Sequence, residues 1–220
     1  EVRNEFPSAA PGAPAFGCNQ GYDNDEAVWE RLGGSAPLRW LGRRMIVRSS
    51  NLATNICLTA AGLDAVARVW RLAGAAHSVV GRCIEDTAAS EAGITNLVTA
   101  ADLAALLGAI ATGAGGPDGA ASRLAGPGSC REMLDVLLAQ EGRDDLAAGL
   151  PPGTRVAHKG GWIRGIRHGA GVVYPADTPP YVIVCCASTP LARNEAGDEA
   201  CRLVARVAAA SWADRHALSS

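Results

Sequence analysis

The sequence lacks long apolar runs and the short cysteine and histidine motifs that mark several large classes of protein. No segment of the 220 residues reaches the ~18 consecutive apolar residues of a membrane-spanning helix. Its seven cysteines show no C-x-x-C spacing, and its four histidines are scattered. A structural zinc site needs such clusters, so we expect no membrane span, metal or other cofactor.

Lysine is almost absent as well. Of the 20 basic residues, only Lys159 is a lysine, and the formal net charge is -2. A dedicated nucleic-acid-binding protein would need a concentrated basic face. Nucleic acid is therefore not an expected partner.

The beginning of the chain carries no signal-peptide pattern. It reads "EVRNEFPSAAPGAPAFG", with no initiator Met and no apolar h-region. Because this opening does not look like a natural N-terminus, the compartment stays unknown, and both a cytoplasmic and an exported location remain open.

Changes in residue pattern divide the chain into three expected parts. Residues 1–34 are rich in Pro, Gly, Ala and Asn and are expected to be largely irregular. Residues 35–150 read as a helical subdomain with a long omega-type loop at about 77–98. After Pro151-Pro152-Gly153, residues 151–220 read as strands followed by a terminal helix.

Helices are expected where apolar residues recur at helical spacing behind a capping residue. Ser35 is a candidate N-cap with Pro37 in the first turn and Leu38 and Leu41 on the inner stripe. Thr99 is a second candidate N-cap. The expected helices cover residues 35–47, the segment after Asn51, 63–74, 99–113, 129–140 and a closing helix through Ala200, Val204 and Trp212.

Three runs after residue 150 have the pattern of strands. "TRVAHKGGWI", "GAGVVYP" and "PYVIVCCAST" are separated by turn residues, which predicts an antiparallel meander. The closing helix has an apolar stripe suited to packing on that sheet. The expected fold class is therefore α+β, with a helical subdomain and an antiparallel sheet covered by a C-terminal helix.

Three short stretches could carry chemistry. Ser49-Ser50-Asn51 can be a polar helix start, because Ser and Asn are good N-caps, or it can relay a proton and hold a substrate amide. Lys159-Gly160-Gly161 can be a strand with a tight bend, or a strand that a ligand approaches closely beside a positive charge.

The third stretch is the long loop. Its carboxylates Glu85, Asp86 and Glu91 can be solvated, or one of them can act on a water as general base. Arg82 could pair with Asp86 or Glu85 and so hold the loop in place.

Taken in order, these stretches resemble class A β-lactamases and related penicillin-binding serine hydrolases of actinobacterial type, whose signature is S-x-x-K, S-D-N and K-T-G with a loop glutamate. "MIVRSSNLATNICL" resembles the S-D-N segment, "GRCIEDTAASEAGITNLV" the omega loop, and "GTRVAHKGGW" the K-T-G strand. The resemblance covers nearly the whole chain. It implies a β-lactamase/transpeptidase-like fold, a β-lactam or peptide-like substrate and a protein that is monomeric when complete.

The resemblance also implies a role for each matching residue. Ser49 would shuttle a proton to the leaving nitrogen, and Asn51 would position the substrate amide. Lys159 would steady Ser49 and attract the substrate carboxylate, and the acyl group would lie beside Gly161. Glu85 would activate water, with Glu91 as the alternative.

The chain departs from the family pattern at several points. No S-x-x-K motif can exist, because the only lysine has Val156 three positions before it. In the family, the nucleophile helix and the first strands precede the S-D-N segment, so we expect the chain to be N-terminally truncated. We also expect the isolated chain to fold poorly or aggregate, because an open sheet edge would remain.

Substitutions within the motifs also matter. Gly160 replaces the threonine of K-T-G and removes a hydroxyl that would bind the substrate carboxylate, and Ser50 replaces the aspartate of S-D-N. Arg164 or Arg167 could compensate by reaching a carboxylate. The sequence thus predicts a serine hydrolase fragment that is inactive alone; the alternatives are a non-catalytic relative that binds cell-wall peptides or a protein, and a D-alanyl peptidase.

Overall fold

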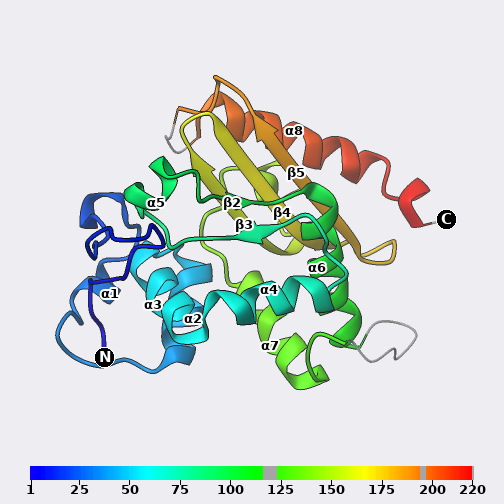
Figure 1. The fold of residues 1–220 in the computed structure, drawn as a ribbon. Coiled ribbons are helices and arrows are strands. Elements are labelled where there is room, and N and C mark those ends of the chain that lie inside the picture. Colours follow the sequence, from blue (N-terminus) through cyan, green and yellow to red (C-terminus); the bar gives the residue numbers. More distant parts are fainter. Residues whose placement is uncertain (116–122, 194–196, 220) are drawn as a thin grey trace. The chain divides into compact units, whose positions relative to one another are not determined.

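The computed structural model describes residues 1–115, 123–193 and 197–219 and divides the chain into two compact units (Figure 1). The first unit comprises Glu1–Leu72 and Ala76–Val98, and the second comprises Ala73–Ala75 and Thr99–Ser220. Residues 116–122, between the helices expected at 99–113 and 129–140 and predicted to be part of a loop, lie outside the described residues.

The first unit is built from short helices and irregular chain. Its elements are η1 (Gln20–Tyr22), α1 (Glu26–Trp29), α2 (Leu38–Val47), α3 (Asn51–Ala61), α4 (Leu63–Leu72), β1 (Val79–Val80), α5 (Thr87–Glu91) and β2 (Asn96–Leu97). Its buried core joins the N-terminal segment to the helices: Val2, Phe6 and Cys18 pack with Leu41 of α2 and Leu52 of α3. The irregular segment is therefore part of the core of this unit.

Helix α2 begins later than the sequence predicts. Pro37, with φ -62° and ψ 138°, precedes the first helical residue, so the prediction of Ser35 as N-cap is wrong. The proline ring disfavours helical backbone at Ala36, which prevents the helix from starting before it. Leu41 is buried as expected, but Leu38 is 55% exposed and lies outside the core.

The segment 77–98 contains more regular structure than the sequence indicates. Val79 pairs with Leu97 and Val80 with Asn96 in a short antiparallel ladder. The Asn96 side chain reinforces this pairing, because its Oδ1 accepts hydrogen bonds from the N–H groups of Gly81 (2.9 Å) and Arg82 (3.1 Å). The two ends of the loop are thereby held together.

The second unit contains the sheet. Its elements are α6 (Ala100–Gly113), α7 (Pro127–Leu138), η2 (Leu146–Gly149), β3 (Arg155–Ile163), β4 (Ile166–Tyr174), β5 (Tyr181–Ser188), α8 (Glu199–Ala213) and η3 (Ala217–Ser219). The strand order β3-β4-β5 is antiparallel throughout, so the predicted meander is confirmed. Strand β4 starts at Ile166 rather than at residue 169, because Arg164 and Gly165 (φ 82°) form a two-residue turn.

Helix α8 covers the sheet in the way the apolar stripe predicts. Its residues Val204 and Ala208 share a core with Val156 of β3, Val173 of β4 and Ile183 of β5. Val207, which belongs to the predicted stripe, is 38% exposed. The expected capping of α6 is also confirmed, because Thr99 Oγ1 accepts a hydrogen bond from Asp102 N at 3.0 Å.

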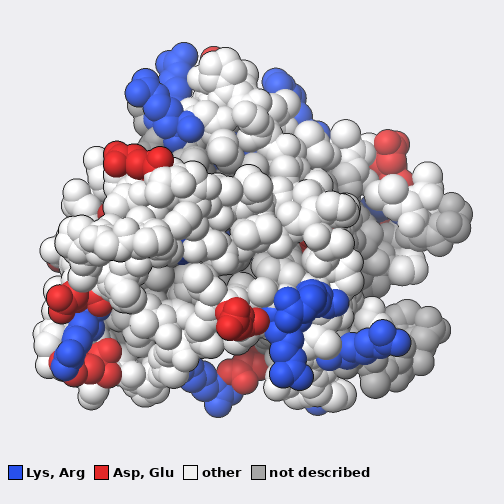
Figure 2. Space-filling model, viewed as in Figure 1, with Lys and Arg blue, Asp and Glu red and all other residues white. Residues whose placement is uncertain are grey.

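Two surface properties bear on possible partners. On the face drawn in Figure 2, the described acidic and basic side chains form small separate groups of either sign. Among the described residues, no single helix has the length and apolarity of a membrane span; α3 and α4 meet the test only jointly, with an 87° bend between them.

Candidate active site

The Ser-Ser-Asn triplet forms the sharp turn between α2 and α3. Ser49 has a left-handed backbone (φ 59°), which is strained for a residue with a side chain. Ser50 follows as the N-cap of α3 and is fully buried, and its Oγ accepts a hydrogen bond from Ala53 N at 3.1 Å. The expected helix start is therefore confirmed at Ser50, and Ser49 and Asn51 on either side of it are partly buried.

Asn51 contacts one of the carboxylates of the long loop. Its Nδ2 donates to Glu85 Oε1 at 3.0 Å and also lies 3.3 Å from the carbonyl oxygen of Tyr22. The other carboxylate oxygen of Glu85 accepts a hydrogen bond from the backbone N–H of Asn19 at 2.7 Å. Two predicted site residues, 34 positions apart, are thus joined directly.

Glu85 is held in place by its two neighbours in the chain. Ile84 exchanges two hydrogen bonds of 2.8 Å with the buried side chain of Asn55 in α3. Asp86 is buried, and its carboxylate accepts hydrogen bonds from Ala89 N (3.1 Å) and Ala9 N (2.8 Å). With both neighbours fixed, Glu85 adopts a left-handed backbone (φ 65°) that an unconstrained glutamate would avoid.

Burial alone would raise the pKa of Asp86. Hydrogen bonds from Ala9, Ser8 and Ala89 outweigh it, so the pKa lies below its ordinary value and the carboxylate is ionised at neutral pH. Asp86 is therefore an anchor of the loop and caps α5.

Glu91 and Arg82, the other candidate groups of the loop, have different surroundings. Glu91 is the last residue of α5 and is exposed. The guanidinium of Arg82, expected to pair with a carboxylate, donates to the carbonyl oxygens of Ile94 (3.0 Å) and Cys83 (3.2 Å). The Arg82 side chain therefore holds the loop by hydrogen bonds to the loop's own backbone carbonyl groups.

The second unit carries the other predicted residues on β3. Lys159 is partly buried, and its Nζ donates to the carbonyl oxygen of Gly160. Burial lowers the pKa of Lys159 to about 8, although the negative charge of Asp145 opposes this change. Because successive strand residues alternate in direction, Lys159 and Gly161 share one face and Gly160 faces the other.

The lack of a side chain at Gly160 is explained by the position of Asp145, a residue that the sequence pattern did not single out. A Cβ on Gly160 would lie 2.2 Å from Asp145 Oδ2, whereas a Cβ on Gly161 would have no atom within 4 Å. Asp145 is buried, and its Oδ1 caps η2 by accepting a hydrogen bond from Leu146 N at 2.6 Å. Burial and the nearby charge of Asp144 raise the pKa of Asp145. A carboxylate therefore occupies the space of a side chain at position 160.

The two candidate arginines differ in their surroundings. Arg164 is exposed in the turn between β3 and β4. Arg167 is fully buried, stacks on the ring of Trp162 at 4.8 Å, and lies 3.4 Å from Asp198 Oδ2. Of the two, Arg167 thus reaches a carboxylate, and that carboxylate belongs to the protein itself.

The predicted residues fall into two sets. Ser49, Asn51 and Glu85 come together within the first unit, and Lys159, Gly160, Gly161 and Arg164 lie on or beside β3 of the second. Sequence reasoning missed the anchors Asn19, Asp23, Asn55 and Asp145, of which only Asn55 belonged to a quoted motif. Within the described part of the chain, no group of three His, Cys, Asp or Glu residues could hold a metal ion.

Comparison with known proteins gives a family and a fold. A model described as the β-lactamase enzyme family matches residues 24–212. Among curated proteins, no relative matches this chain. A variant of PBP-A, solved as an acyl-enzyme complex with penicillin G, is 22% identical with a TM-score of 0.70, over 97% of this chain and 73% of that chain.

Two further structures are similar. A β-lactamase from Sphaerobacter thermophilus is 26% identical with a TM-score of 0.65, over 82% of this chain and 64% of that one. A variant of the class A β-lactamase of the last common ancestor of Gram-negative bacteria is 22% identical with a TM-score of 0.71, over 98% of this chain and 76% of that one.

Proposed function

Because the chain belongs to the β-lactamase enzyme family, we propose that it carries part of the active site of a serine hydrolase that cleaves an amide or a β-lactam through an acyl-enzyme. It has the α+β fold of class A β-lactamases that its sequence predicts. The observation that carries the proposal is the 3.0 Å hydrogen bond between Asn51 and Glu85. It joins the predicted amide-binding residue to the predicted water-activating residue.

In the proposed reaction, a serine hydroxyl adds to the substrate carbonyl, the C–N bond breaks and the nitrogen takes a proton through Ser49. A water then attacks the ester carbonyl while Glu85 accepts its proton as general base, the ester C–O bond breaks, and the serine oxygen takes a proton back. The geometry supports this role for Glu85, because Asn51 and Asn19 N hold one carboxylate oxygen each. Asn51 would also position the substrate amide.

On β3, Lys159 would attract the substrate carboxylate, with the acyl group beside Gly161. The open space around a Cβ on Gly161 is consistent with an approaching ligand. Arg164, exposed beside this strand, would be a second positive charge for an anionic substrate.

We propose that the nucleophile belongs to a segment other than these 220 residues, because they contain no S-x-x-K. Loss of a serine nucleophile costs on the order of 10⁶ in rate in a triad enzyme. We therefore expect no acyl transfer by the chain alone. The test is to combine it with an upstream segment bearing S-x-x-K and to measure a penicilloyl adduct by mass spectrometry.

A matched pair of variants identifies the general base. Glu85→Gln should let the adduct accumulate by slowing hydrolysis about 10²-fold or more. Glu91→Gln changes a carboxylate of the same loop that is exposed and should leave hydrolysis unchanged. No adduct with any β-lactam would rule out lactamase activity.

A non-catalytic relative that binds cell-wall peptides or a protein partner is the second candidate. The observation that favours it is the Asp145 carboxylate beneath Gly160, which excludes a side chain from the position of the K-T-G threonine. A D-alanyl peptidase would instead hydrolyse D-alanyl peptides, with slow deacylation. The coding sequence immediately upstream of codon 1 discriminates between an enzyme of either kind and the non-catalytic binder. An in-frame S-x-x-K favours an enzyme, and a start codon with a promoter favours the binder.

A further inference from the structure

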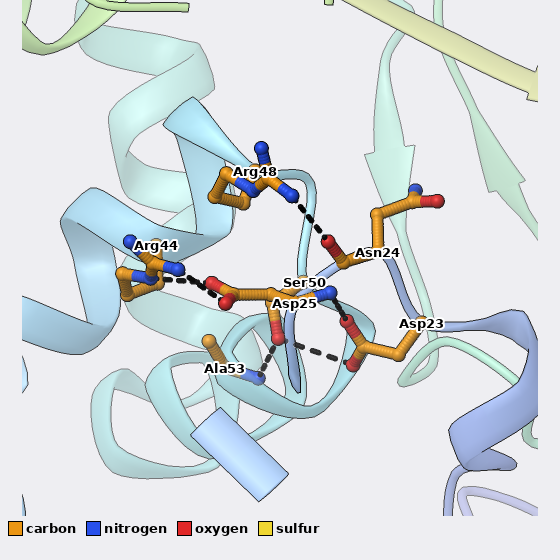
Figure 3. A network of polar contacts seen from close by, with 7 residues as sticks. All are labelled: Asp23, Asn24, Asp25, Arg44, Arg48, Ser50 and Ala53. Atoms are coloured by element: carbon orange, nitrogen blue, oxygen red, sulfur yellow. Dashed lines mark hydrogen bonds and ion pairs between the residues drawn. The ribbon is translucent and has the colours of Figure 1, made fainter. Parts of the chain in front are cut away.

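The buried hydroxyl of Ser50 is paired with a carboxylate from a distant part of the chain. Ser50 Oγ accepts a hydrogen bond from Ala53 N and donates its proton to Asp23 Oδ2 at 3.1 Å. Asp23 Oδ2 also accepts a hydrogen bond from Leu52 N at 2.9 Å. Figure 3 shows this carboxylate directed at Ser50 beside the first turn of α3.

Asp23 therefore contributes the negative charge that a helix start favours. The first N–H groups of a helix have no partner within the helix, and a carboxylate there is stabilised by hydrogen bonds and by the helix dipole. Ser50 satisfies one of these N–H groups and Asp23 a second. Because Ser50 is fully buried, no water can take over either hydrogen bond without rearrangement.

The residues that follow Asp23 connect the same stretch to α2. Asp25 is buried and forms an ion pair with Arg44. Arg48 Nη2 donates to the carbonyl oxygen of Asn24 at 3.3 Å. The segment 23–25 thus contacts both the last turns of α2 and the first turn of α3, on either side of Ser49 (Figure 3).

This arrangement determines where the two neighbours of Ser50 lie. Ser49 is held with φ 59° just before the cap, and Asn51 is the first helical residue, whose side chain reaches Glu85. A change in the cap would move both.

We propose that Asp23 is a positioning residue: its carboxylate and the Ser50 hydroxyl act together as a two-residue N-cap that fixes Ser49 and Asn51 for the reaction. The part that concerns the reaction rests on the proposed function. The same capping could be performed by one aspartate at position 50, because aspartate and serine are about equally good N-caps.

Amide hydrogen exchange tests the cap independently of any activity. Asp23→Ala should accelerate exchange at Leu52 and Ala53 about fivefold to tenfold, the loss typical of an N-cap. Ser50→Asp should also accelerate exchange, because it places a second carboxylate beside Asp23. The exchanged pair Asp23→Ser with Ser50→Asp should return both amides to within about twofold of the wild-type rate. Glu30→Ala, at an exposed carboxylate of the same segment, is the control and should change nothing.

Hydrolysis of the penicilloyl adduct in the complemented protein tests the positioning role. Asp23→Ala should slow hydrolysis at saturating β-lactam, and the exchanged pair should restore it while Glu30→Ala stays at the wild-type rate. Unchanged exchange in Asp23→Ala, or no rescue by the exchanged pair, would overturn the two-residue cap. Altered exchange with unaltered hydrolysis would overturn the positioning role. If no variant forms an adduct, the proposed function fails, and the exchange data alone decide on the cap.

Discussion

Replacing Gly160 by threonine restores the residue that the K-T-G motif carries, and the structure predicts that this harms the protein. The new Cβ would lie 2.2 Å from Asp145 Oδ2, far inside van der Waals contact. The carboxylate would have to move, although it is buried and caps η2 through Leu146 N. Overpacking typically costs about 1–3 kcal/mol and a lost cap about 1 kcal/mol, so we expect Gly160→Thr to lower the free energy of unfolding by about 2–4 kcal/mol.

The assay is urea unfolding of the chain combined with its upstream segment, followed by tryptophan fluorescence, to which Trp162 and Trp212 of the second unit contribute. Asp145→Ala removes the clashing oxygen, so Gly160→Thr should cost about 1–3 kcal/mol less in that background. Gly161→Thr is the matched control, because a Cβ there meets no atom within 4 Å. The free energy of unfolding of Gly161→Thr should stay within about 0.5 kcal/mol of the wild-type value. Equal costs of Gly160→Thr with and without Asp145 would refute the steric argument.

Three further predictions concern the second unit. Burial, aided by the charges of Arg143 and Lys159, lowers the pKa of His158 from 6.5 to about 4, so between these pH values His158 is protonated in the unfolded chain but not in the folded one. The free energy of unfolding should therefore fall by on the order of 3 kcal/mol as the pH drops through this window. His158→Phe should abolish that fall in acid titrations of stability. Because burial lowers the pKa of Lys159 to about 8, affinity for a carboxylate-bearing ligand should decrease as pH rises through this value, and Lys159→Met should remove this dependence in calorimetric titrations. Strand β5 pairs only with β4 among the described strands, so its free edge should promote aggregation. Cys186→Lys, at an exposed position of β5, should reduce concentration-dependent light scattering. Unchanged scattering would count against β5 as the strand through which the chains aggregate.

Sequence reasoning succeeded where structure follows from neighbours a few positions apart. The cap at Thr99, the buried positions Val204 and Ala208 of α8 and the strand periodicity after residue 150 are local patterns, and the structure has them. Ser35 as N-cap was a local prediction that failed, because another local rule overrode it: the restriction that Pro37 imposes on Ala36. Folding poorly in isolation remains a prediction.

The anchors of the candidate site were not predictable in this way, because they join distant positions. Asp23 and Ser50 are 27 residues apart, and Asn19 and Glu85 are 66 apart. No periodicity connects such pairs, and a carboxylate or amide in an irregular segment carries no local signal of its partner. Family resemblance supplied Ser49, Asn51 and Glu85, but it supplied no reason for their orientations.

That reason lies in the segment that appeared least structured. Residues 1–34 contain short helical turns and an isolated β-bridge between Phe6 and Phe16, and side chains hold further parts of the backbone: Asn4 exchanges hydrogen bonds of 2.7 and 2.9 Å with the backbone of Cys18. Next to that anchored residue, Asn19 binds Glu85, and a few positions later Asp23 binds the start of α3. These hydrogen bonds pair and fix backbone groups of the segment, so we expect the segment to hold Ser49 and Glu85 in their strained conformations. The irregular N-terminal chain is therefore part of the proposed site, and substitutions there should affect catalysis before they affect the sheet.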